Sequence, residues 1–200
     1  MTKRLHSKYS ACKRLRGSYK NLWGLSKKNF FRSVLNNKKR KRITLFGKLL
    51  NIKQSFKLFY SNVGEVNFKK YVRQSVNSPS KSTDKLSSVL ESRLDCILFR
   101  SCLARSFLQA RQLINHGYVK VNGLLVKNPS TKLSNGDIIK LDSTGHSINL
   151  FNEVVSSRSL PNYLEVDFST LTIVFLWDTD IKNCFYPIKL KYLNVFRYYK

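Results

Sequence analysis

The sequence predicts an α+β fold, with helices in the first half of the chain and most strands in the second. Apolar residues recur at helical intervals between Ile43 and Tyr60. The pair Asn122-Gly123 separates two β-prone runs, which is the strongest short signal for a hairpin. Around Leu164 to Phe168, apolar and acidic residues alternate as in a strand with one buried face. We therefore expect a basic N-terminal arm, a helical region, an inserted module of two helices and a small sheet, and a β-rich C-terminal segment.

The charge of the chain is strongly positive and unevenly distributed. Lys and Arg number 37 against 11 acidic residues, which gives a formal net charge of +26. Residues 1–64 hold 18 of the basic residues and no acidic one. Such a chain repels itself unless a polyanion neutralises it, so nucleic acid is the first candidate partner and an anionic membrane the second.

The predicted N-terminal arm, residues 1–42, ends in the densest basic block of the chain. The arm contains serines and no acidic residue, so it also has the composition of a mitochondrial transit peptide. The block is denser than import requires, which favours an RNA-binding arm over a cleaved leader. The block consists of Lys38, Lys39, Arg40, Lys41 and Arg42.

Residues 43–90 form the predicted helical region. Its first helix has one apolar stripe for the protein core and a flank of lysines off that stripe. A helix lying on a membrane surface would look similar, but a stripe of this width is ordinary for a core helix. A shorter helix is expected from about Val66 to Val76, and the polar stretch 75–88 marks a boundary. The stripe is Leu45, Leu49, Ile52, Phe56 and Phe59, and the lysines are Lys48, Lys53 and Lys57.

The central module, residues 91–142, begins with two short helices. Arg93 and Arg100 lie seven residues apart on one face of the first helix, which we expect to point to solvent or to a partner. The second helix opens with Ser106 and has Gln109 three residues on, the pattern of a capping box.

The second helix of the module should end at Gly117, because a helix terminus favours a residue that tolerates the left-handed conformation. A hairpin with its turn at Asn122-Gly123 follows. The turn Asn135-Gly136-Asp137 then leads into a further strand at 138–141.

These segments resemble the S-four RNA-binding domain, the module named for small-subunit ribosomal protein four. The family usually has Gly at the position of Cys102, and a basic residue directly after the Ser/Thr cap, where this chain has Phe107. Arg105, just before the cap, can supply the displaced charge. The matching motifs are Arg93-Leu94-Asp95, Ala110-Arg111-Gln112-Leu113-Ile114, His116-Gly117, Val119-Lys120-Val121-Asn122-Gly123, Asn128-Pro129-Ser130 and Gly136-Asp137-Ile138-Ile139.

The C-terminal part divides into a polar linker, 143–159, and a β-rich segment, 160–200, which we expect to pack on the helical region. Strands are expected at 164–168, 171–177 and 188–192. Residues 161–167 resemble the C-terminal signature of ribosomal protein four, and the tail is similar to mitochondrially encoded versions. The composition, with 13 Phe and 10 Tyr against 8 Gly and 4 Pro, is typical of the A/T-rich codons of an organelle genome.

The resemblance implies a structural constituent of the mitochondrial small ribosomal subunit, located in the matrix. It would bind small-subunit rRNA near the 5′ domain, where several helices meet, support subunit assembly and translation, and lie beside neighbouring ribosomal proteins near the mRNA entrance. A free-standing RNA-binding factor, for ribosome rescue or rRNA maturation, is the alternative. An RNA-modifying enzyme that carries this module needs a catalytic domain, and the remaining sequence is too short and too basic to hold one. We therefore expect that the protein is not an enzyme.

The candidate RNA contacts are cations, together with one helix start. The helix that opens at Ser106 offers free N–H groups and a positive dipole end to an anion, and guanidinium groups hold phosphate with two bonds. A-form RNA hides its base edges in a deep groove, so such a surface reads backbone shape. The predicted RNA-binding residues are Arg93, Arg100, Arg105, Ser106, Arg111, His116, Lys120 and Lys127, with the basic block Lys38, Lys39, Arg40, Lys41 and Arg42.

The sequence gives no indication of catalysis, a cofactor or a membrane span. The four cysteines have no metal-ligand spacing and are expected to be reduced, apolar fillers. The three histidines are far apart, and His116 stands at a helix end where its charge suits the dipole. The longest apolar run, 171–177, is too short to cross a bilayer. We expect no catalytic residue, no cofactor, no metal, no membrane and no small-molecule substrate.

Overall fold

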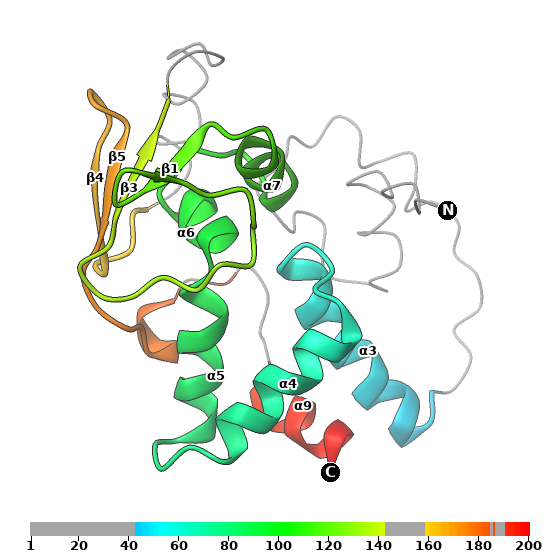
Figure 1. The fold of residues 1–200 in the computed structure, drawn as a ribbon. Helices are drawn as coiled ribbons and strands as arrows, with labels where there is room; N and C mark the ends of the chain where they lie inside the picture. Colours follow the sequence, from blue (N-terminus) through cyan, green and yellow to red (C-terminus); the bar gives the residue numbers. More distant parts are fainter. Residues whose placement is uncertain (1–42, 143–158, 185, 187–190) are drawn as a thin grey trace. The chain divides into compact units, whose positions relative to one another are not determined.

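The computed structural model describes residues 43–142, 159–184, 186 and 191–200 (Figure 1). The chain divides into two compact units. The described part of the first unit is 43–68, 186 and 191–200, and that of the second is 69–142 and 159–184. The predicted arm at 1–42, with its basic block, and nearly all of the predicted linker lie outside the described residues.

The first unit is built from helices α3 (Leu45–Phe59) and α9 (Tyr192–Tyr199) and the start of α4 (Glu65–Val76). Thr44 caps α3, since its hydroxyl accepts a hydrogen bond from the Gly47 N–H at 3.2 Å. Helix α9 packs on α3, where the rings of Phe56 and Tyr192 meet edge to face with their centroids 4.8 Å apart.

Two expectations for the first unit were only partly right. The apolar stripe of α3 is buried at Phe56 and Phe59, but Leu45 at its start is 75% exposed. Lys53 and Lys57 do not form a free basic flank, because both donate to the carboxylate of Glu65, at 2.9 and 2.7 Å. Burial alone would raise the pKa of Glu65, but the hydrogen bonds from Lys57, Tyr199 and Lys53 lower it to about 2.

The end of the chain is helical, whereas the sequence predicted a strand that would include Tyr192. Tyr192 and Val195 are the buried residues of α9, and they lie three apart, at helical spacing. Their burial against α3 explains why this stretch forms a helix, since both side chains then share one face.

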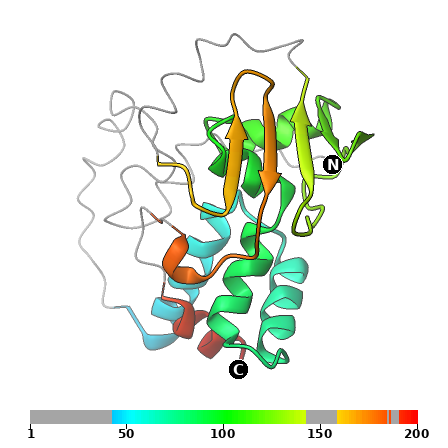
Figure 2. The ribbon, with the colours of Figure 1, turned by 90° about the vertical axis from the view of Figure 1, so that its left-hand side faces the viewer.

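The second unit has helices α5 (Ser82–Glu91), α6 (Leu94–Arg100) and α7 (Phe107–Asn115), and a short 3-10 turn, η2 (Ile181–Asn183). A five-stranded antiparallel sheet has the order β2-β1-β3-β5-β4. Helices α6 and α7 cover one face of this sheet (Figures 1 and 2). The strands are β1 (Val119–Val121), β2 (Leu124–Leu125), β3 (Ile138–Leu141), β4 (Leu164–Asp167) and β5 (Thr172–Phe175). The predicted α+β class is confirmed.

The C-terminal segment, 160–200, packs on the helical region only in part: α9 packs on α3 and η2 on α5, whereas β4 and β5 join the sheet of the central module. Strand β5 pairs with β3, placing Ile139 opposite Ile173, so β4 and β5 extend the sheet of the central module. Without this hairpin, one side of β3 would be left with unpaired backbone groups. The inner face is apolar, with Val119, Ile139 and Phe175 fully buried.

Local turn signals in the central module are confirmed. Gly117 has φ +80° and follows α7 in a Schellman motif, in which the N–H groups of Gly117 and Tyr118 bond to the carbonyls of Ile114 and Leu113. Asn122 and Gly123 both have positive φ, as a type I′ hairpin turn requires.

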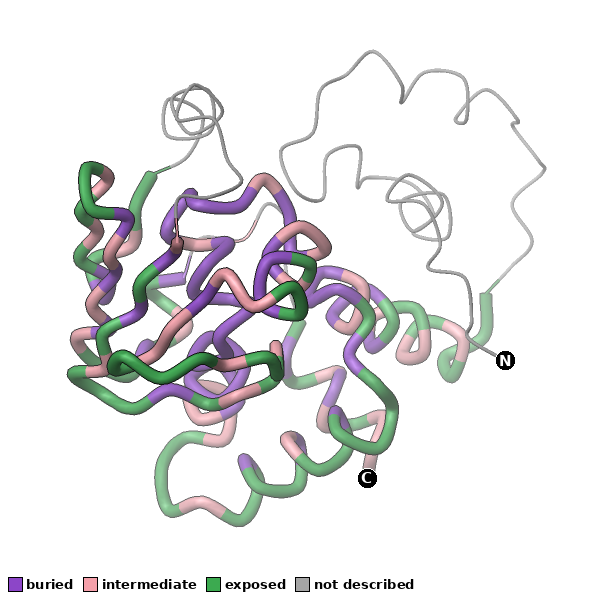
Figure 3. The backbone as a smooth tube through the Cα atoms, turned by 45° about the horizontal axis from the view of Figure 1, so that its top comes forward, coloured by how far each residue is buried: buried purple, intermediate pink, exposed green. Residues whose placement is uncertain are grey.

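Cys102 has φ +65° and is fully buried. An L-residue is strained in the left-handed region, where glycine is not, so glycine would suit this position better. Buried residues run without a break from Leu86 to Phe99, and Cys102 is buried as well. Buried stretches of the backbone are drawn purple in Figure 3.

Candidate nucleic-acid interface

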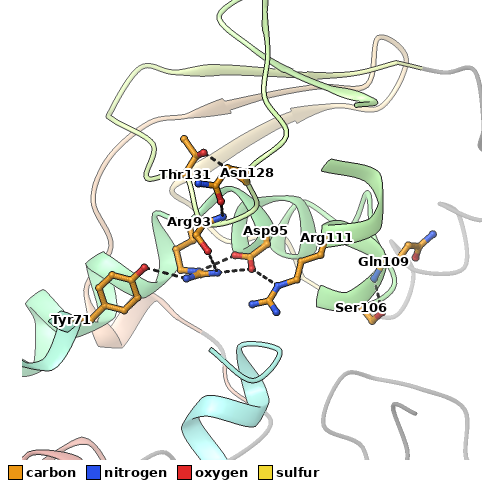
Figure 4. Close-up of polar contacts among 9 residues, drawn as sticks. Tyr71, Arg93, Asp95, Ser106, Gln109, Arg111, Asn128 and Thr131 are labelled. Carbon is orange, nitrogen blue, oxygen red and sulfur yellow. Dashed lines mark hydrogen bonds and ion pairs between the residues drawn. The ribbon is translucent and has the colours of Figure 1, made fainter. Parts of the chain in front are cut away.

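Arg93, just before α6, lies inside the protein and holds Asp95 with two hydrogen bonds. Its Nε donates to Asp95 Oδ1 at 3.0 Å and its Nη2 to Oδ2 at 2.8 Å (Figure 4). The side chains are only 3% and 1% exposed. The remaining donors of Arg93 reach the hydroxyls of Tyr71 at 3.3 Å and Ser130 at 3.1 Å. Burial alone would lower the pKa of Arg93, but Asp95 raises it.

Arg100, at the end of α6, is held in the same way by Glu91. The Nε and Nη2 of Arg100 donate to the Glu91 carboxylate at 2.9 and 2.7 Å, and the side chains are 9% and 0% exposed. The same carboxylate accepts bonds from the Cys96 thiol at 2.9 Å and the Tyr163 hydroxyl at 3.1 Å. Although burial opposes it, Glu91 raises the pKa of Arg100 well above its usual value.

The expectation that Arg93 and Arg100 point to solvent was therefore wrong. Arg93 is the extended N-cap residue of α6 and Arg100 its last residue, and each is turned toward a buried carboxylate of the same unit. A buried arginine needs such a partner, because an unpaired charge in the interior is very costly. The feature of the sequence that could have indicated inward-pointing arginines was the presence of Asp95 and Glu91 close to them, in a chain with only 11 acidic residues.

The turn at Asn128–Thr131 fixes the start of α6. The carbonyls of Thr131 and Pro129 accept hydrogen bonds from the N–H groups of Leu94 and Asp95, at 3.0 and 3.2 Å. The turn is closed by its own side chain, since Asn128 Oδ1 accepts from the Ser130 N–H at 3.0 Å. The first N–H groups of a helix have no hydrogen-bond partner within the helix. At the start of α6 this turn supplies acceptors for two of them, in place of a side-chain cap.

The predicted capping box at the start of α7 is confirmed in its first half. The Ser106 hydroxyl accepts from the Gln109 N–H at 3.3 Å, whereas Gln109 Oε1 accepts from the Arg105 N–H at 2.8 Å. Phe107, which directly follows the cap, is fully buried and stacks on Phe99 with ring centroids 4.2 Å apart. Arg105 is only half-buried and is the nearest cation in sequence to this helix start.

Arg111, on α7, connects the buried network to the surface. Its Nε donates to Asp95 Oδ2 at 2.9 Å, and its side chain is 24% exposed. Asp95 Oδ2 therefore accepts from two arginines at once (Figure 4). Two guanidinium groups therefore share one carboxylate, and Arg111 is the member of this cluster that is partly exposed.

The outer face of the sheet carries cations, and one of them was missed by sequence reasoning. Lys120 of β1 lies directly opposite Lys140 of β3, and Lys140 is exposed. Like charges opposite one another destabilise a sheet unless an anion lies between them. Lys120 pairs with Asp142 at 3.1 Å. The alternation Ile138-Ile139-Lys140-Leu141 was the signal for an outward Lys140.

The other predicted residues of the module are at the surface. His116 and Lys127 are exposed, and the His116 ring lies parallel to that of Tyr118 with the centroids 6.3 Å apart. Lys132, which pairs through its backbone with Arg93, is also exposed and was not predicted. The residues Lys38, Lys39, Arg40, Lys41 and Arg42 lie outside the described part of the chain.

The described residues contain no grouping of three or more His, Cys, Asp or Glu side chains that could bind a metal ion. Three cysteines in this part, Cys96, Cys102 and Cys184, are buried and unbonded to one another. Among the described helices, none has the length and apolarity needed to cross a membrane.

Comparison with known proteins places the chain in a family. Residues 92–139 match the model of the S4 domain. Over its whole length the chain is similar to the small ribosomal subunit protein uS4 of several bacteria. It is 32% identical to that of Rhodospirillum centenum over 205 residues, which covers 100% of this chain and 99% of the relative, and 30% identical to that of Caulobacter vibrioides over 206 residues, with the same coverage. The chain therefore belongs to the family of small ribosomal subunit protein uS4.

Proposed function

We propose that this protein is a structural constituent of the mitochondrial small ribosomal subunit. It binds small-subunit rRNA at a junction of several helices, supports subunit assembly and translation, and lies among neighbouring ribosomal proteins near the mRNA entrance. The observation that carries the proposal is the full-length similarity to uS4 proteins, combined with a net charge of +26. It acts by binding and positioning RNA, not as an enzyme, and needs no cofactor.

The sheet supports an RNA-binding role by its charge arrangement. Lys120 and Lys140 face each other across β1 and β3, and Lys127 is exposed beyond the hairpin. The net repulsion between lysines is relieved when phosphates lie over them. A basic surface of this kind recognises the spacing of phosphates in folded RNA, because A-form helices hide their base edges.

The arginines can bind phosphate with a more defined geometry than the lysines. Arg111 is held by Asp95 but remains partly exposed, and Arg105 lies next to the α7 start. A guanidinium can bind phosphate with two parallel hydrogen bonds, which fixes orientation as well as affinity. Arg93 and Arg100 are proposed to support this surface from within, since both are engaged by buried carboxylates.

The mitochondrial location rests on composition. Phe and Tyr are abundant and Gly and Pro are scarce, as an A/T-rich organelle genome favours. Mass spectrometry of small subunits purified from mitochondria of the source organism, washed at high salt, tests this location. Presence of the chain at one copy per subunit is expected. Loss of the chain in the wash would favour a free-standing RNA-binding factor.

RNA binding itself is tested by the salt dependence of affinity. The full chain should bind a transcript of the 5′ domain of bacterial small-subunit rRNA more tightly than an RNA duplex of equal length. Log K should fall linearly with log salt, by about 0.7 to 0.9 per neutralised phosphate. A nearly flat response, or equal affinity for both RNAs, would contradict the proposal.

A further inference from the structure

Asp95 is a buried carboxylate placed between an interior arginine and a surface arginine. Its Oδ2 accepts from Arg93 Nη2 at 2.8 Å and from Arg111 Nε at 2.9 Å, while Oδ1 accepts from Arg93 Nε. Asp95 is 1% exposed, whereas Arg111 is 24% exposed.

We infer that Asp95 is a positioning residue for RNA binding, which holds the guanidinium of Arg111 in one orientation toward an RNA phosphate. The inference rests on the proposed RNA-binding function. Figure 4 shows the guanidinium turned with its Nε toward Asp95 and its two Nη atoms beyond it. A guanidinium fixed along one edge loses little further freedom when it binds phosphate, which is how preorganisation increases affinity.

The carboxylate is itself held rigidly, which positioning requires. Arg93 donates a hydrogen bond to each carboxylate oxygen of Asp95. It also donates to the hydroxyls of Tyr71 on α4 and of Ser130 in the turn at 128–131. The backbone N–H of Asp95 donates to the carbonyl of Pro129. Asp95 is thus fixed through both its backbone and its side chain, so its rotation away from Arg111 would break several hydrogen bonds.

Positioning by Asp95 and a purely electrostatic effect of its charge predict opposite changes in RNA affinity when Asp95 is replaced. Asp95 and Arg93 neutralise each other inside the protein, and Arg111 is the partly exposed member of the cluster. If Asp95 acted only through its negative charge, removing it would strengthen binding to a polyanion. If Asp95 positions Arg111, removing it weakens binding although the protein becomes more positive.

The test is a double-mutant cycle in the full chain, with binding to the same 5′-domain transcript at fixed salt. Arg111→Ala should weaken binding about tenfold, the value of a charge-assisted hydrogen bond. Asp95→Asn should weaken it several-fold, and the double variant should bind no more weakly than Arg111→Ala. Glu165→Gln is the matched control: Glu165 is exposed on β4, and its replacement should leave affinity unchanged or slightly increased.

Tighter binding by Asp95→Asn, or losses that simply add in the double variant, would overturn the inference. If the wild-type chain fails to prefer the transcript, the proposed function fails instead. If Asp95→Asn does not fold, two further measurements decide. Arg111→Lys keeps the charge but lacks the Nε donor, so wild-type affinity in this variant would count against positioning. In the free wild-type protein, the Nε–H of Arg111 should exchange slowly with solvent by NMR, and rapid exchange would refute a fixed guanidinium.

Discussion

Replacing Glu91 by glutamine should destabilise the second unit more than any other single neutralisation of an acidic residue. Glu91 is fully buried and accepts four hydrogen bonds, two from Arg100 and one each from Cys96 and Tyr163. Glutamine has nearly the same shape but no charge, so it removes the negative charge that faces the buried guanidinium of Arg100. Breaking a buried ion pair from one side costs about 3–5 kcal/mol. That loss is a large part of the total stability of a domain, which is about 5–15 kcal/mol.

Urea unfolding of the full chain, followed by circular dichroism, measures this effect. With a slope of about 1–3 kcal/mol per molar urea, the midpoint of the second unit should fall by about 2 M. Glu165→Gln removes the same charge from an exposed site and should leave the midpoint unchanged within about 0.3 M. A similarly small shift for Glu91→Gln would refute the reasoning, because it would mean that Arg100 finds water or another anion.

A second comparison separates the charge from the packing at this position. The double variant Glu91→Leu with Arg100→Met removes both charges and fills the site with apolar side chains. It should be less destabilised than Glu91→Gln alone, since no uncompensated charge remains in the interior. If the double variant is instead the least stable, the polar network contributes more than the ion pair does, and Cys96 and Tyr163 become the next residues to replace.

Three further outcomes are expected. Cys102→Gly should be more stable than Cys102→Ala by about 1 kcal/mol in urea unfolding, because both variants lack the sulfur and only alanine is strained at φ +65°. If the alanine variant is instead the more stable, residue 102 does not adopt the left-handed conformation. The pKa of Glu65 is lowered from 4.5 to about 2, so its stabilisation of the first unit is fully present above pH 4.5 and is lost as pH falls from 4.5 toward 2. Urea midpoints measured across this range should fall with pH, and Glu65→Gln should remove this pH dependence. Lys140→Ala should reduce the salt slope of RNA binding by about 0.7 to 0.9, because one phosphate contact is lost. An unchanged slope would place Lys140 outside the RNA contact.

The buried arginines also change how a loss of RNA binding is interpreted. A variant of Arg93 or Arg100 that binds RNA weakly has lost an internal ion pair, so its folding must be measured before a phosphate contact is assigned. Arg111, Lys127 and Lys140 are better positions for such an assignment, because their side chains reach the surface of the second unit.

The sequence by itself determined the features that depend on a few neighbouring residues. Asn122-Gly123 specified its hairpin turn, and Gly117 the end of α7, because these residues accept positive φ where others are strained. Ser106 specified its cap for a similar reason, since its short side chain reaches the Gln109 N–H within one helical turn. The order and spacing of its motifs also specified the S4 domain.

Only the tertiary structure decided which of the predicted cations face outward and which segments complete the sheet. Arg93 and Arg100 turn inward because Asp95 and Glu91 are buried beside them, and β5 pairs with β3 although 30 residues separate the two strands. Helical or strand spacing shows which side chains share a face, but not what that face meets. The free energy of a buried charge or an added strand depends on partners brought together by the fold, and such partners leave no local pattern in the chain.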